Sequence, residues 1–183
     1  MLLSQIGIPH EVWEPDVDER VHVADTFDEL VIRIAMDKAV NVAHRARQGI
    51  VIGADTIVVL NDEIFGKPKD MMQAHEMLTQ LQGTTHQVYT GVAVVDADTL
   101  EVKAGYRKVD VLMAPCTNEM LMAYIATGES MDKAGAYGIQ GMGAALIQAI
   151  HGDYYAVVGL PLELTVQLLT EFGVGEVWGI VVH

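Results

Sequence analysis

The sequence contains little cysteine, few basic residues and no long apolar run, and each shortage excludes a class of protein. Cys116 is the single cysteine among 183 residues, so no disulfide can form within the chain and we expect a reducing compartment. Lys and Arg number 11 against 25 Asp and Glu. A nucleic-acid-binding surface needs accumulated cations, so we expect no nucleic-acid partner. No apolar run approaches the roughly 20 residues of a membrane span, so we expect no membrane partner.

The first residues lack the basic flank and the apolar stretch of a secretory signal peptide. Together with the single cysteine, this favours a cytoplasmic protein. The composition is 51% hydrophobic and 20% charged, which is enough for a packed core and argues against disorder. The length fits one globular domain, or one core divided into two lobes by a cleft.

Helical and strand patterns alternate along the chain and predict an α/β fold. Thr26 and Glu29 have the capping-box spacing that begins a helix, and Gly49 is expected to end it. Asp70 can cap a second helix. The other expected elements are a strand over 50–60 interrupted at 53–55, strands near 87–95 and 100–113, a helix over 117–127, a strand pair formed by 144–150 and 154–158, and a last helix beginning at Pro161.

Asp55 is the first candidate for chemistry, because it interrupts an otherwise apolar strand. A carboxylate in such a place must be paired, bound to a metal or exposed in a cleft, since burying it without a partner is costly. The alternative is an Asp that only accepts backbone hydrogen bonds at a strand end.

Lysines form a second group of candidates. Lys67 stands in the sequence Gly-Lys-Pro-Lys at 66–69, where the fixed backbone of Pro68 can direct an ammonium at a phosphate. Lys38 stands among apolar residues of its helix. A solvated loop at 66–69 and a Lys38 stem that merely reaches to solvent are the alternatives.

The most unusual segment is 132–141, which reads Asp-Lys-Ala-Gly-Ala-Tyr-Gly-Ile-Gln-Gly. Small residues let the backbone approach a ligand closely, while Lys133 supplies a cation and Gln140 an amide that can bind a base edge. The spacing excludes a Walker loop and a dinucleotide fingerprint. A tight structural loop is the alternative.

Other common catalytic patterns are missing. The seven His lack metal-ligand spacing, no Gly-x-Ser-x-Gly elbow occurs, and Cys116 is expected to be a small core residue. The methionines are expected to fill the core, including Met71, Met72, Met77, Met120 and Met122.

Taken in order, several segments resemble the Maf family over nearly the whole chain. They are Ala-Met-Asp-Lys-Ala at 35–39, Gly-Ala-Asp-Thr at 53–56, Gly-Lys-Pro-Lys at 66–69, Thr-His-Gln-Val-Tyr-Thr-Gly at 85–91, the segment 132–141 and Val-Gly-Leu-Pro at 158–161. The form of 132–141 is similar to the branch that acts on dTTP and UTP.

The resemblance implies a Maf/ITPase-like α/β fold with a mixed sheet and two lobes flanking a substrate cleft, formed by one domain over 1–183. It implies hydrolysis of a nucleoside triphosphate to the monophosphate and pyrophosphate. The expected substrates are dTTP and UTP, with modified pyrimidine nucleotides as further candidates. A divalent cation, Mg²⁺ or Mn²⁺, would be required, and the protein would be a homodimer.

The resemblance also assigns roles to single residues. Asp55 corresponds to the proton acceptor and, with Glu19, to the acidic groups that would hold the metal. The substrate-binding and specificity positions correspond to Lys38, Thr56, Lys67, Lys133 and Gln140.

One departure from the family pattern concerns the N-terminus. The family opens with a strand and a Ser-x-Arg-Arg turn before a helix with a Leu-Leu pair, and Leu2-Leu3 corresponds to that pair. The expectation is therefore a truncated N-terminus, and it motivates an alternative function. This alternative is a nucleotide-binding, division-associated protein with little or no turnover, because each missing charged hydrogen bond to phosphate costs roughly 1.5–3 kcal/mol.

Overall fold

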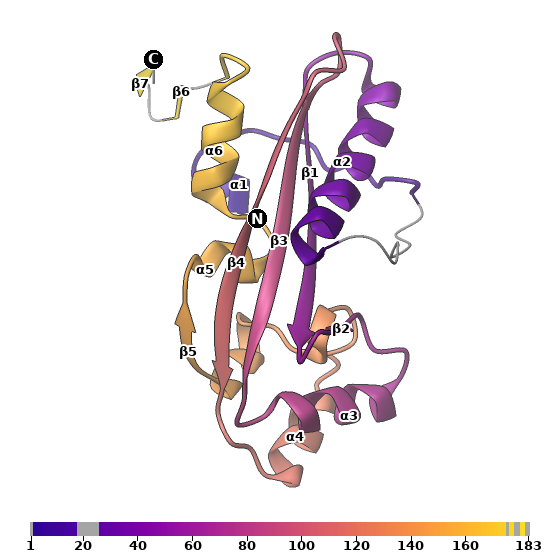
Figure 1. Ribbon diagram of the computed structural model, residues 1–183, viewed down its shortest axis with the longest axis vertical. Coiled ribbons are helices and arrows are strands. Elements are labelled where there is room, and N and C mark those ends of the chain that lie inside the picture. The colour runs from indigo at the N-terminus through magenta and orange to yellow at the C-terminus, as the bar shows by residue number, and fades with distance from the viewer. Residues whose placement is uncertain (1, 18–25, 175, 178–179, 182–183) are drawn as a thin grey trace. The chain divides into compact units, whose positions relative to one another are not determined.

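The computed structural model describes residues 2–17, 26–174, 176–177 and 180–181. Its helices and strands confirm the expected α/β class (Figure 1). In chain order they are α1 (Leu2–Gln5), α2 (Phe27–Ala46), β1 (Ile50–Leu60), β2 (Glu63–Phe65), α3 (Met71–Leu81), β3 (Thr85–Asp96), β4 (Val102–Met113), α4 (Asn118–Ile125), the 3-10 turns η1 (Ala134–Ala136) and η2 (Gly141–Leu146), β5 (Ile147–His151), α5 (Tyr154–Val158), α6 (Leu162–Thr170), β6 (Glu176–Val177) and β7 (Ile180–Val181).

Five strands form an antiparallel sheet in the order β2-β1-β3-β4-β5. The chain divides into two compact units. Unit 1 consists of Met1–Asp55, Thr90–Arg107 and Gly159–His183, and unit 2 of Thr56–Tyr89 and Lys108–Val158. The division falls within the three longest strands, so each of them contributes residues to both units.

Local hydrogen bonds mark the start and the end of helix α2. The Thr26 N–H donates to Glu29 Oε2 at 3.0 Å, as the capping-box spacing predicts. Arg47 follows the last turn in the left-handed conformation, with φ 65°, and its N–H donates to the Ala43 carbonyl. The helix therefore ends slightly before Gly49, the residue expected to end it.

In unit 1 the strand alternation sorts apolar side chains into two layers. Ala93 and Val95 of β3 pack with the alanines of α2, whereas Val92 and Val94 pack with Leu164 and other residues of α6. Strand β1 follows the same rule, because successive side chains of a strand point to opposite faces. Helices α2 and α6 therefore cover opposite faces of the unit 1 strands, as can be followed in Figure 1.

Two glycines let α2 lie very close to these strands. A Cβ on Gly53 of β1 would collide with the Ala35 carbonyl and would lie 2.9 Å from the Ala39 Cβ. A Cβ on Gly91 of β3 would collide with the backbone of Val31. These glycines fix where α2 lies against the strands, and with it the residues that α2 carries toward β1.

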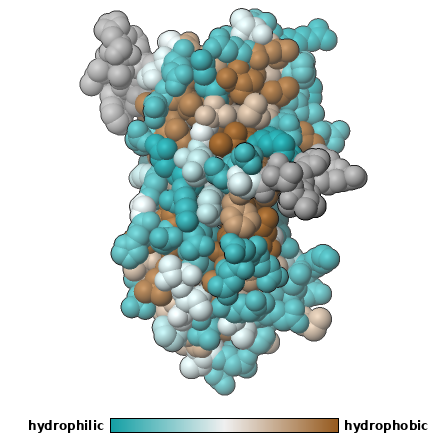
Figure 2. Space-filling view, viewed as in Figure 1, coloured by the Kyte–Doolittle hydropathy of each residue, from teal (hydrophilic) through white to brown (hydrophobic). Residues whose placement is uncertain are grey.

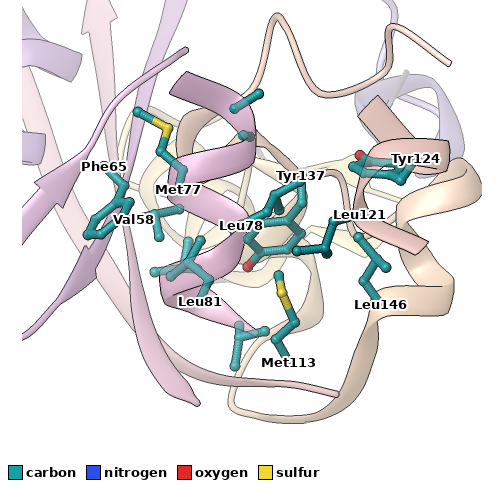
Figure 3. Packing of buried hydrophobic residues seen from close by; sticks show 14 of the residues in the cluster. Val58, Phe65, Met77, Leu78, Leu81, Met113, Leu121, Tyr124, Tyr137 and Leu146 are labelled. Carbon is teal, nitrogen blue, oxygen red and sulfur yellow. The ribbon is translucent and has the colours of Figure 1, made fainter. Parts of the chain in front are cut away.

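Unit 2 has its own hydrophobic core (Figure 3). Helices α3 and α4 pack against each other, and the Asp70 side chain caps α3 by accepting the Gln73 N–H at 2.8 Å. Buried side chains of both helices belong to the core, and its largest members include Phe65, Met77, Leu78, Leu81, Met113, Leu121, Tyr124, Tyr137 and Leu146.

Three local expectations are wrong. Strand β1 is continuous, because Gly53 and Asp55 keep the extended conformation. Residues Tyr154–Val158 form helix α5 instead of a strand, and the Asp153 carboxylate caps it by accepting the Tyr155 N–H at 2.8 Å. Residues 141–146 form the 3-10 turn η2, so only Ile147–His151 is left as a strand, and its partner is β4.

The methionine prediction also needs correction. Met77 is buried, but Met71 and Met72 lie in the exposed first turn of α3. Met120 and Met122 are exposed on α4, whose buried side is formed by other residues. Figure 2 shows one face of the molecule, on which hydrophobic areas alternate with hydrophilic ones.

Helix α6 agrees with the sequence pattern. It follows Pro161 and buries Leu164, Leu168 and Leu169, and Gly173 beyond its end has φ 70°.

Within the described ranges, no helix combines the length and apolarity that crossing a membrane requires.

Candidate active site

Asp55 and Lys38 form an ion pair in unit 1. The Lys38 ammonium donates to Asp55 Oδ1 at 2.7 Å. Asp55 lies two residues after Gly53 on β1, so its side chain points to the face that α2 covers. Lys38 lies on α2 between Ala35 and Ala39, the two residues that meet Gly53. The close approach of α2 to the strand therefore places the ammonium at the carboxylate.

The pair is largely withdrawn from solvent. The side chains of Lys38 and Asp55 keep only 17% and 10% of their accessible surface. A charge-assisted hydrogen bond of this kind is roughly twice as strong as a neutral one. The sequence is compatible with several environments for Asp55, and the structure shows the one in which its carboxylate is paired.

Residues 14–16 are attached to α2 by hydrogen bonds. The Asn41 side chain forms two hydrogen bonds with the backbone of Asp16, one as donor and one as acceptor, both at 3.0 Å. Arg45 donates to the Glu14 carbonyl at 2.7 Å. Glu19 itself lies outside the described residues, so its expected role at the metal stays a prediction.

Thr56 follows Asp55 on β1 and belongs to unit 2. Because strand side chains alternate, Thr56 points to the opposite face from Asp55. Its side chain is partly buried.

In unit 2, two of the expected phosphate-binding lysines lie near one carboxylate. The Lys133 ammonium donates to Asp132 Oδ1 at 2.7 Å, and this hydrogen bond, with the charges of Lys133 and Lys67, holds the pKa of Asp132 below its usual value. The backbone joins the two segments, because the Gly135 N–H donates to the Gly66 carbonyl at 3.1 Å. Segments 66–69 and 132–141 are therefore neighbours within unit 2.

Gln140 is exposed and directly precedes η2. The loop before it is compact. A Cβ on Gly138 would lie 2.8 Å from Cε of Lys133, and Tyr137 is buried with its hydroxyl 2.6 Å from Nε2 of His86. The exposed Gln140 thus follows a tightly packed loop.

Carboxylates are the groups that would hold a divalent cation in this protein. Across the part of the chain that the structure describes, no group of three or more His, Cys, Asp or Glu is arranged to hold a metal ion. Mg²⁺ is usually held by one or two carboxylates together with substrate phosphates and waters. Asp55 fits that pattern as one of the carboxylates.

These segments carry the resemblance noted in the sequence, and a comparison of the chain with protein families decides its assignment. The family of Maf-like proteins matches residues 1–172. The chain belongs to this family.

Several curated relatives of this Maf-like chain share one name. A protein of Symbiobacterium thermophilum, named dTTP/UTP pyrophosphatase, is 54% identical over 172 residues, which cover 94% of this chain and 88% of the relative. Proteins of the same name from Bacillus cytotoxicus and Desulforamulus reducens are 44% and 43% identical, over 95% and 94% of this chain and 90% and 91% of the relatives.

Sequence reasoning missed two groups of residues in this Maf-like chain. Glu129 and Tyr124 bind the backbone on both sides of Gln140, and His86 supports Tyr137 from within the core. The sequence does show an acidic residue, Glu129, shortly before the segment 132–141. An isolated Glu in a polar loop, however, does not indicate which groups it binds.

Proposed function

We propose that this protein hydrolyses dTTP and UTP to the monophosphate and pyrophosphate, with modified pyrimidine nucleotides as further candidate substrates. The family assignment and the printed name of its relatives support the reaction class. The observation that carries the proposal is the partly buried pair of Asp55 and Lys38 at 2.7 Å, which supplies a carboxylate and a cation at one place.

In this proposal Asp55 accepts the proton of the water that attacks the α-phosphorus. A positioned general base contributes typically about 10²–10⁴-fold to a rate. The ammonium of Lys38 holds the carboxylate in place and adds positive charge where negative charge develops. A bond forms between the water oxygen and the α-phosphorus, and the bond to the bridging oxygen breaks, so pyrophosphate leaves.

The remaining roles belong to unit 2. Lys67 and Lys133 would offset charge on the phosphates, as lysines do in phosphoryl-transfer enzymes. Gln140 would bind the edge of the pyrimidine, because an amide both donates and accepts hydrogen bonds. Thr56 would contribute to the choice of nucleotide.

We further propose that Asp55 and Glu19 hold Mg²⁺ or Mn²⁺ together with the phosphates. Hard oxygen ligands favour these ions. When bound, such a cation neutralises developing charge on the triphosphate.

Assembly and location complete the proposal. The family resemblance supports a homodimer. The lone cysteine Cys116 supports a location in the cytoplasm, where thiols stay reduced. Light scattering on the purified protein tests the dimer by its mass.

The experiment that tests this function incubates the chain with each common nucleoside triphosphate and Mg²⁺ or Mn²⁺. The expected result is equal release of monophosphate and pyrophosphate, fastest for dTTP and UTP. Release of orthophosphate would overturn the reaction class. Nucleotide binding at micromolar concentration with background hydrolysis alone would favour the nucleotide-binding alternative.

A further inference from the structure

The carboxylate of Glu129 binds the backbone on the C-terminal side of Gln140. Glu129 Oε2 accepts the Met142 N–H and Oε1 accepts the Gly143 N–H, each at 2.9 Å. These hydrogen bonds lower the pKa of Glu129, so the side chain is charged at neutral pH and both bonds are charge-assisted.

Tyr124 binds the backbone on the other side. Its hydroxyl accepts the Gly138 N–H at 3.1 Å and donates to Glu129 Oε1 at 3.2 Å. Burial raises the pKa of Tyr124 to about 12, so the hydroxyl keeps its proton and can donate. The two side chains therefore form one connected anchor.

Two glycines of this turn, Gly141 and Gly143, lie so close to the side chains of Glu129 and Tyr124 that a Cβ would not fit. A Cβ on Gly141, which has φ 67°, would lie 2.5 Å from Glu129 Oε2. A Cβ on Gly143 would collide with the Gly138 carbonyl and would lie 2.8 Å from the Tyr124 hydroxyl. The backbone from Gly138 to Gly143 is thus folded back on itself around these two side chains.

Gln140 is an exposed residue in the middle of that turn. Its backbone is fixed two residues before, at Gly138, and two residues after, at Met142. Neither anchoring group is itself on the turn, since Tyr124 belongs to α4 and Glu129 follows that helix. Tyr124 and Glu129 therefore determine where the backbone of Gln140 lies.

We propose that Glu129, together with Tyr124, is a positioning residue that fixes Gln140 and thereby sets which pyrimidine base the protein accepts. This rests on the proposed function, in which Gln140 binds the base edge. Thymine and uracil present a carbonyl and a ring N–H where cytosine presents an amino group and a ring acceptor, so an amide carried by a fixed backbone can separate them.

The test compares Glu129→Gln with the wild type. The substitution keeps size and shape, but one of its two terminal atoms becomes an NH₂ donor that faces a backbone N–H of Met142 or Gly143. The quantity measured is the ratio of kcat/KM for dTTP to kcat/KM for dCTP. Loss of one charge-assisted hydrogen bond corresponds to about tenfold, and we expect the ratio to fall by about that factor.

Two controls separate positioning from general stability. Glu76→Gln makes the same change at an exposed position of α3 and is expected to leave the ratio and Tm as in the wild type. Gln140→Ala is combined with Glu129→Gln, because a residue that acts through Gln140 should have no further effect on the ratio once Gln140 is removed.

The outcomes are distinct. A lower ratio in Glu129→Gln that disappears in the Gln140→Ala background supports the proposal. An unchanged ratio, or equal losses of kcat/KM for both nucleotides, overturns it while the proposed function stands. A wild type that hydrolyses neither dTTP nor UTP overturns the proposed function, and this inference with it.

Discussion

The Lys38 ammonium lies 2.7 Å from Asp55 Oδ1, although 17 residues separate the two in sequence. The contact depends on a third residue, Gly53, whose missing side chain lets α2 approach β1. Local backbone geometry and the chemistry of the candidate site are therefore coupled. A change in the packing of α2 should be measurable as a change in activity.

Lys38→Met should reduce both activity and stability. The variant keeps an unbranched apolar stem but removes the charge beside a carboxylate that is 10% exposed. We expect kcat/KM to fall by about 10–100-fold and the free energy of unfolding to fall by about 1–3 kcal/mol. Steady-state kinetics and urea denaturation measure the two effects.

Lys103→Met is the matched control, because Lys103 pairs with Glu101 at 3.0 Å but is 37% exposed. Surface ion pairs contribute about 0–1 kcal/mol, so stability and kinetics should stay close to the wild type. Equal effects of the two substitutions would show that the Lys38 pair has no special role.

Gly53→Ala should destabilise the protein and displace Lys38. The added methyl group meets backbone and Cβ atoms of α2, and overpacking of this kind costs about 1–3 kcal/mol or more. Gly66→Ala is the control for stability, since a Cβ there has nothing within 4 Å. Urea denaturation should separate the two variants clearly, and a stable Gly53→Ala protein would contradict the packing that we describe.

Elements with a strong period were predictable from the sequence. Val109, Val111 and Met113 alternate with less buried residues and form the end of β4, and the helix capped by Asp70 follows its apolar pattern. The β-branched and aromatic residues of Tyr154–Val158 suit either structure, so their pattern predicts a strand where the protein has a helix. The Asp153 cap that decides the matter is local and short.

The site was only partly predictable, for a different reason. Asp55 is predictable as a candidate because it is an acid among apolar residues, but no period in the sequence places Lys38 beside it. Their proximity depends on how far α2 stands from the strand, and that is a tertiary property. Glu129 was missed because its partners are backbone N–H groups, which leave no trace in residue type.

Acidification should destabilise the protein through His86. Burial lowers the pKa of His86 to about 4, whereas an unfolded His has a pKa near 6.5. The unfolded state therefore binds more protons between these values, so stability is full above about pH 6.5 and is lost as the pH falls toward 4.

The measurement is urea denaturation at pH 7 and pH 5. We expect the wild type to lose about 2 kcal/mol more between these values than His86→Leu/Tyr137→Phe. This double variant replaces the hydrogen-bonded pair of His86 and Tyr137 with apolar groups. The same loss in both proteins would show that His86 stays solvated.

Turnover should depend on a divalent cation. A chelator should abolish hydrolysis of dTTP, and added Mg²⁺ or Mn²⁺ should restore it. Glu19→Gln should raise the cation concentration needed for half-maximal rate, because one carboxylate ligand is lost. Full activity in excess chelator would contradict the metal proposal.

The most direct test of the central claim is pyrophosphate release from dTTP by Asp55→Asn and by Asp37→Asn. Asp37 also lies on α2 but is exposed and pairs with Arg33 at 3.4 Å, so its variant controls for the loss of one carboxylate. The account predicts that Asp37→Asn forms dTMP and pyrophosphate at the wild-type rate, while Asp55→Asn is slower by at least about 100-fold. Wild-type pyrophosphate release by Asp55→Asn would contradict it.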